Sequence, residues 1–161
     1  MNSSNKLTRG FTLFEVLMVL VIIGIISVTG SGYYTNIVKD LDLSVVAENI
    51  IFDLKAAQAK AMTGESGERW GVCFRNPSSG SDVYEIVSPA STCTESGSST
   101  VKTTVYLQGA TVFEVPAAGT TVSVVFNKIT GATQSAVDQT IRIVLNNQPR
   151  TITITPIGRI Y

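Results

Sequence analysis

The stretch GFTLFEVLMVLVIIGIISVTG, residues 10–30, decides how this chain is organised. After Gly10 it contains a single charged side chain, Glu15. An apolar run of about 20 residues is long enough to cross a hydrocarbon core of about 30 Å as a helix. We therefore predict that residues 11–32 form a membrane-spanning helix that also serves as an assembly segment.

The ten residues before this run are polar and include Lys6 and Arg9. Basic side chains next to a membrane span favour the cytoplasmic side, so the N-terminus is predicted to be cytoplasmic and the rest of the chain exported. Residues 1–10 have the character of a leader peptide, and residues 64–161 are then an exported domain.

Glu15 is the most informative residue of the apolar run. An ionised carboxylate deep in a membrane helix costs about 2.5 kcal/mol or more, so it calls for a cationic partner. Cleavage between Gly10 and Phe11 would create an α-amino group four residues from Glu15, on the same helix face. In an assembly, the same amine could neutralise Glu15 of the next subunit and set the register of stacked helices.

The run GFTLFEVLMVLVIIGIIS is similar to the class III signal of bacterial type IV prepilins and type II secretion pseudopilins. The resemblance implies that a prepilin peptidase cleaves after Gly10 and methylates Phe11, and that Glu15 directs assembly. It also implies an inner-membrane location, incorporation into a filament, other pilins or pseudopilins as partners, and contact with assembly platform proteins.

An ordinary secretory signal peptide or a plain signal anchor is the alternative. A secretory signal would be cut after its apolar part, near the small residues 27–32. Its apolar core would then exceed the usual length of about 7–15 residues, and Glu15 inside it would serve no purpose.

Residues 33–63 are predicted to continue the helix in amphipathic form, ending near Thr63 and Gly64. Apolar residues recur at helical spacing on one face: Leu43, Ala47, Ile50, Leu54, Ala57 and Ala61. Charged residues are assigned to the opposite face: Asp40, Asp42, Glu48, Asp53, Lys55 and Lys60.

Alternating apolar and polar residues predict antiparallel strands in the remainder. The expected strands cover residues 69–74, 83–87, 101–107, 121–126, 141–145 and 151–155, and those at 101–107, 141–145 and 151–155 are expected to be half-buried. The fold class is therefore α+β and pilin-like: a long N-terminal helix packed on a C-terminal antiparallel sheet domain.

The exported part is similar in layout to H-type type II secretion pseudopilins and FimT-like minor pilins. Four segments carry this resemblance: FDLKAAQAKAM, WGVCF, FNKITGAT and RTITITPIGRIY. It implies a minor structural subunit of a pilus or pseudopilus.

Composition excludes several other functions. The chain has no His, and its 12 Lys and Arg balance its 12 Asp and Glu. Without His a conventional catalytic triad cannot be built and metal sites are disfavoured, so neither an enzyme activity nor a cofactor is expected. The two cysteines, Cys73 and Cys93, allow one disulfide, which could contribute about 3 kcal/mol by closing a loop of about 20 residues.

Two further sets of residues leave alternatives open. Gly24, Gly30 and Gly32 either allow close helix packing or let the helix partly unwind in a filament. Arg142, Arg150 and Arg159 raise the alternative of a DNA-binding minor pilin, although a neutral balance without a basic cluster favours a solvated sheet face. A membrane-anchored domain that never polymerises is a third possibility.

Overall fold

The computed structural model of the protein describes residues 11–90 and 101–161, without the side chains of residues 28–40. The predicted leader, Gly10 and Cys93 lie outside the described residues. The chain divides into two compact units, Met1–Val38 and Lys39–Tyr161, and each is described by itself.

One helix, α1 (Leu13–Thr63), begins in the first unit and ends in the second. In the second unit its buried face consists of the six apolar residues that the periodicity predicts: Leu43, Ala47, Ile50, Leu54, Ala57 and Ala61. The predicted helix end near Thr63 is confirmed, because Gly64 follows in a left-handed conformation with φ 68° that favours glycine.

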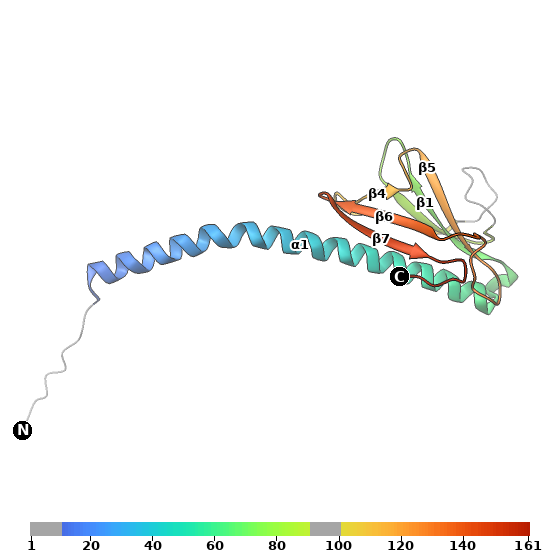
Figure 1. Ribbon diagram of the computed structural model, residues 1–161, viewed down its shortest axis with the longest axis horizontal. Helices are drawn as coiled ribbons and strands as arrows, with labels where there is room; N and C mark the ends of the chain where they lie inside the picture. Colours follow the sequence, from blue (N-terminus) through green and yellow to red (C-terminus); the bar gives the residue numbers. More distant parts are fainter. Residues whose placement is uncertain (1–10, 91–100) are drawn as a thin grey trace, which may run out of the picture. The chain divides into compact units, whose positions relative to one another are not determined.

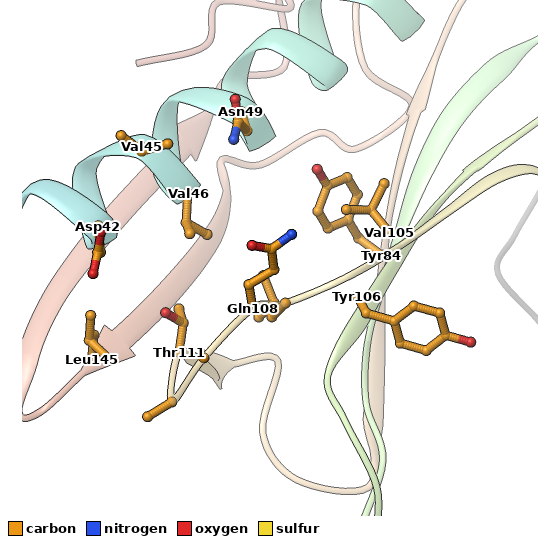
Figure 2. A pocket seen from close by; sticks show the side chains of 13 residues that line it. Asp42, Val45, Val46, Asn49, Tyr84, Val105, Tyr106, Gln108, Thr111 and Leu145 are labelled. Atoms are coloured by element: carbon orange, nitrogen blue, oxygen red, sulfur yellow. The ribbon is translucent and has the colours of Figure 1, made fainter. Parts of the chain in front are cut away.

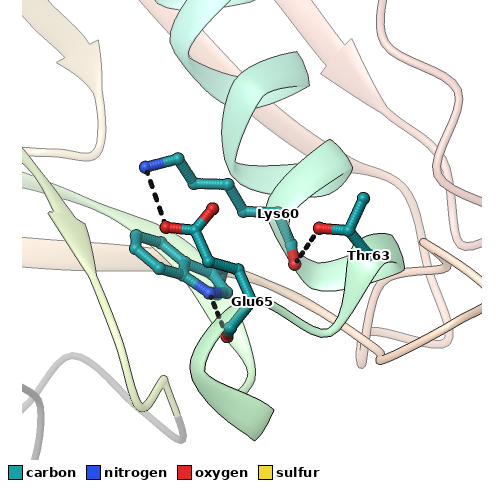
Figure 3. Close-up of polar contacts among 4 residues, drawn as sticks. Lys60, Thr63 and Glu65 are labelled. Atoms are coloured by element: carbon teal, nitrogen blue, oxygen red, sulfur yellow. Dashed lines mark hydrogen bonds and ion pairs between the residues drawn. The ribbon is translucent and has the colours of Figure 1, made fainter.

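The predicted charged face of α1 is wrong at two positions. The half-buried Asp53 accepts a hydrogen bond of 2.7 Å from the hydroxyl of Tyr84. Lys60 lies over the ring of Trp70, 4.3 Å from its centroid, and forms an ion pair with Glu65 (Figure 3). Both charged groups therefore contact the globular domain, because a carboxylate or ammonium at the edge of an apolar stripe can reach polar partners there.

In the part of the chain that the structure describes, seven strands follow the short 3-10 helix η1 (Glu65–Gly67) and form two antiparallel sheets (Figure 1). The four-stranded sheet has the order β3-β2-β1-β5 and comprises β1 (Trp70–Asn76), β2 (Val83–Val87), β3 (Val101–Tyr106) and β5 (Thr120–Phe126). The three-stranded sheet has the order β4-β6-β7 and comprises β4 (Val112–Val115), β6 (Gln139–Leu145) and β7 (Gln148–Ile154).

The larger of two apolar clusters among the described residues joins the buried stripe of α1 to both sheets. Every second residue is buried from Ile141 onward in β6 and from Ile152 onward in β7, because side chains of a strand alternate between its two faces. These residues are Ile141, Ile143, Leu145, Ile152 and Ile154. Phe74 connects the two sheets, since its ring contacts Tyr84 of β2 and Phe113 of β4 at centroid distances of 5.8 Å.

Strand β3 differs from its predicted half-buried form. Val101 is 42 % exposed, and of the apolar residues in this segment only Val105 and Leu107 pack against the core. The cause is its position at the edge of the sheet, where β2 is its only partner among the described strands. Strand β4 was not predicted at all.

Two buried polar side chains hold β4 in place. The Asn76 amide on β1 donates hydrogen bonds of 2.9 Å to the carbonyl oxygens of Phe113 and Pro116. The Asp82 carboxylate accepts a hydrogen bond of 2.5 Å from the backbone N–H of Phe113. Side chains on β1 and just before β2, in the four-stranded sheet, therefore form the hydrogen bonds that the backbone around β4, in the three-stranded sheet, requires.

Candidate functional site

The first turn of α1 is fixed by Thr12, which precedes the helix. The Thr12 hydroxyl accepts a hydrogen bond of 3.3 Å from the N–H of Glu15, and its carbonyl accepts bonds from the N–H groups of Glu15 and Val16. Thr12 is thus the N-cap, and Glu15 occupies the third helical position, where a carboxylate interacts favourably with the helix dipole. The pattern Thr-x-x-Glu is a capping-box signature, which our sequence interpretation overlooked.

The structure places Phe11 two residues before α1 and Glu15 in its first turn, and both side chains are exposed, Phe11 by 79 %. Among the described residues, the Glu15 carboxylate has no hydrogen bond or ion pair with a side chain. The Glu15 carboxylate can therefore pair with a cationic group outside the described residues. Gly10, the predicted cleavage site, lies outside the described residues.

The apolar side chains from Phe11 to Ile26 are exposed on all sides of the helix. Their exposed fractions range from 48 % at Val19 to 85 % at Leu13. A helix that is apolar all round is normally covered by other helices or by lipid, because such a surface is unfavourable in water. Nothing in the described part of this chain covers it.

Among the described residues, no helix combines the length and the mean hydropathy needed to cross a membrane. The predicted span at residues 11–32 accordingly stays a prediction.

At the other end of α1, two turns from the C-terminal half of the chain meet the helix. The side-chain amide of Gln58 donates hydrogen bonds to the carbonyl oxygens of Gly131, at 2.8 Å, and Gly158, at 2.7 Å. The N–H of Ile129 bonds to the carbonyl of Ala61. These contacts fix the 127–131 and 155–159 turns against the helix and against each other.

Gly158 permits this approach. Its φ is 85°, and an added Cβ would collide with the carbonyl oxygen of Gly131 and the amide of Gln58. Only glycine fits this close contact between two backbone turns. The segments FNKITGAT and TPIGR therefore act together structurally, although they lie far apart in the sequence.

A groove lies between α1 and the segment that follows β3 (Figure 2). Its cavity volume is about 430 Å³. Val45 and Val46 line one side, and Val105 and Leu107 line the other. Asp42 stands at its edge on α1, and its carboxylate makes no ion pair within the described chain. The sequence did not predict this groove, because it depends on how the β3 segment packs on the helix.

The three C-terminal arginines do not form one basic surface. Arg142 lies on the face of β6 opposite the buried Ile141 and Ile143, and it forms an ion pair of 3.1 Å with Glu114. Arg150 shares the helix-facing side of β7 and donates a hydrogen bond to Ser44 of α1. The structure thus separates two of the three predicted residues onto opposite faces of one sheet.

Cys73 is fully buried on β1. Because Cys93 lies outside the described residues, the Cys73–Cys93 disulfide remains a prediction.

The described fold is an α+β chain with an N-terminal helix packed on antiparallel sheets. Residues 5–31 match the family model described as the prokaryotic N-terminal methylation motif, the signature of type IV pilins and pseudopilins. The match includes Gly10, Phe11 and Glu15 and does not extend into the sheet domain. Comparisons with curated proteins and with solved structures give no match.

Proposed function

We propose that this chain is a structural subunit of a type IV pilus or a type II secretion pseudopilus. Prepilin peptidase removes residues 1–10, the new N-terminus at Phe11 is methylated, and residues 11–32 hold the subunit in the inner membrane until it assembles. Its sheet domain then lies on the outer side of the membrane. The subunit has no enzymatic activity of its own.

The methylation motif at residues 5–31 carries this proposal. Its support from the fold is the exposed apolar surface between Phe11 and Ile26, which contains one carboxylate in its first turn. Such a surface suits first lipid and then a bundle of identical helices. A plain secretory signal would explain the apolar residues and would leave Glu15 without a role.

Assembly follows from the charges. After cleavage, the Phe11 amine and the Glu15 carboxylate of one chain would lie four residues apart. When a second helix approaches, its Glu15 offers the amine another partner at low dielectric, where the attraction between opposite charges is strong. This pairing favours one axial stagger, so the helices add in a fixed register.

The N-terminus of the mature chain tests the processing step. The full-length protein is isolated from the membranes of a cell that assembles the filament, and cleavage after Glu15 releases the N-terminal peptide. We expect the peptide 11–15 with one methyl group on Phe11. A chain that begins at Met1, or beyond Gly32, would overturn the proposal. Gly10→Ala serves as the control, because it should retain the leader.

Substitution of Glu15 separates an assembling subunit from an anchored domain that never polymerises. Glu15→Gln keeps the size of the side chain and removes its charge. We expect normal export and a loss of the subunit from sheared filaments. Glu15→Asp is the matched control and should retain part of the incorporation.

A further inference from the structure

We propose that the groove between α1 and the β3 segment receives the opposite end of the sheet domain of a second copy of this chain. This inference rests on the proposed function and deepens it, because it names the contact between sheet domains in the filament. Two surfaces carry it, and both belong to the second compact unit.

The first surface is an end patch that comprises Met62, Ile129 and Ile157. Ile129 is 79 % exposed, Ile157 is 70 % exposed and Met62 is 48 % exposed. The hydrogen bonds of Gln58 to Gly131 and Gly158 hold the two turns that carry the isoleucines. The patch is therefore a prominent apolar surface on a rigid base, which reduces the entropy lost on binding.

Ile129 adopts a backbone conformation that its residue type disfavours. Its φ is 70°, and a β-branched residue in the left-handed region is an outlier. Asn or Gly would fit the turn better, and either would remove the exposed apolar side chain. The combination of strain and exposure indicates that the isoleucine serves a contact outside the chain.

The second surface is the groove, whose cavity of about 430 Å³ is large enough to receive side chains of this size. Its lining is mixed: Val45, Val46, Val105 and Leu107 form an apolar part, which lies beside polar side chains such as Asn49 and Gln108. Leu41 and Val45 on the adjoining surface of α1 are more than half exposed. The apolar part of the groove, together with these exposed side chains, is suited to an apolar projection, and the polar part can bind the groups around it.

The charges at the two surfaces are opposite. Lys128 and Arg159 flank the isoleucines of the end patch, and Asp42 lies at the groove. Within the described part of the chain, none of these three side chains belongs to an ion pair. Opposite charges around an apolar contact select the orientation of the partner. Here they bring the end patch of one copy to the groove of another.

The two surfaces cannot satisfy each other within one molecule. Val45 and Met62 are separated by about 26 Å along the helix, at 1.5 Å per residue. A contact between two different surfaces of identical subunits is heterologous, and such contacts generate open helical assemblies. The arrangement of end patch and groove therefore matches the symmetry that a filament requires.

A charge exchange tests the contact in cells that assemble the filament. Asp42→Arg and Arg159→Asp are each expected to reduce incorporation of the full-length chain into sheared filaments by about tenfold or more. The two changes in one chain restore the pairing in reversed form and should restore incorporation. Lys102→Asp, an exposed charge change on β3, is the control and should have no effect. Single variants that assemble normally, or a double variant that stays defective, would overturn the inference.

Ile129→Asn distinguishes a contact from a folding defect. Asparagine suits the positive φ, so the variant should melt at the same temperature as the wild type or higher, while its incorporation falls. Equal incorporation would contradict the proposal.

The identity of the occupant is tested by crosslinking two differently tagged copies, one with Val45→Cys and the other with Ile129→Cys. We expect a disulfide-linked dimer of the two tags in filaments, and none when Lys102→Cys replaces Ile129→Cys. A crosslink to a different subunit instead would contradict the assignment to a second copy. In each of these experiments, methylation of Phe11 and dependence of incorporation on Glu15 are measured as well. These two measurements test the proposed function, so its failure can be distinguished from a failure of the proposed contact.

Discussion

The side-chain amide of Gln58 donates a hydrogen bond to the carbonyl oxygen of Gly158, 2.7 Å away and 100 residues further along the chain. The same nitrogen also bonds to Gly131, at 2.8 Å. One helical side chain therefore connects two turns of the C-terminal half to α1.

Replacement of Gln58 should destabilise the domain. Gln58→Ala removes both bonds and leaves two half-enclosed carbonyl oxygens without a donor, so we expect a loss of about 1–3 kcal/mol in the free energy of unfolding. Denaturant unfolding of the full-length chain in detergent measures it. Lys55→Ala, an exposed position one turn earlier, is the control and should change stability little. Equal stability of both variants would show that the two bonds contribute nothing.

Relief of the strained turn should stabilise the domain. Because a left-handed conformation costs a β-branched residue roughly 1–2 kcal/mol, Ile129→Asn should raise the free energy of unfolding by about 1 kcal/mol. Ile157→Asn provides the comparison, since Ile157 is similarly exposed and has no positive φ. A stability gain of the same size at both positions would point to lost apolar exposure instead of strain.

Tyr84 makes stability dependent on alkaline pH. Burial, and then the hydrogen bond to the Asp53 carboxylate, raise the pKa of the Tyr84 phenol well above its usual value of 10.0. Above that pH the unfolded chain loses the phenol proton while the folded chain keeps it, so stability is fully present below pH 10 and falls as the pH rises further. Unfolding free energies at pH 8 and pH 11 should therefore differ less in Tyr84→Phe than in the wild type. Tyr106→Phe, at an exposed tyrosine, should keep the wild-type difference.

The predicted disulfide has a direct test. If Cys73 pairs with Cys93, Cys93→Ser should lower the free energy of unfolding by about 3 kcal/mol under oxidising conditions, since closing a loop of about 20 residues restricts the unfolded chain. A reducing agent should remove the difference between wild type and variant. A wild-type protein whose stability does not respond to the reductant would contradict the bridge.

DNA binding is expected to be absent. Arg142 and Arg150 lie on opposite faces of their sheet, and Arg142 is neutralised by Glu114. A gel shift with duplex DNA at low salt should show no retardation. Retardation that weakens steeply with added salt, and that Arg159→Ala abolishes, would instead support a DNA-binding subunit.

Local pattern was sufficient to predict much of this fold. The buried residues of α1 from Leu43 to Ala61 follow from helical spacing, and the turn at Gly64 follows from the preference of glycine for positive φ. Strands β6 and β7 follow from their strict alternation. In each case the signal lies within neighbouring residues, so no knowledge of the tertiary structure is needed.

The remaining features depend on contacts between distant segments. Strand β4 has only four residues and a register shift where it pairs with β6, so its alternation is too short to recognise. The division into two sheets is set by pairing, which sequence periodicity does not specify. Gln58 gave no signal either, because its partners are backbone carbonyls in turns that come much later. The predicted roles of Phe11 and Glu15 involve other molecules, so they rest on the motif and its chemistry.

The side-chain amide of Asn76 links the two sheets of the domain. Its amide on β1 holds the backbone of the β4 segment at Phe113 and Pro116, and each of these strands belongs to a different sheet. Local opening at this amide would expose the backbone of both sheets to solvent together. The two sheets are thereby coupled into one cooperative unit, and amide protons in β1 and β4 should exchange with a common opening free energy.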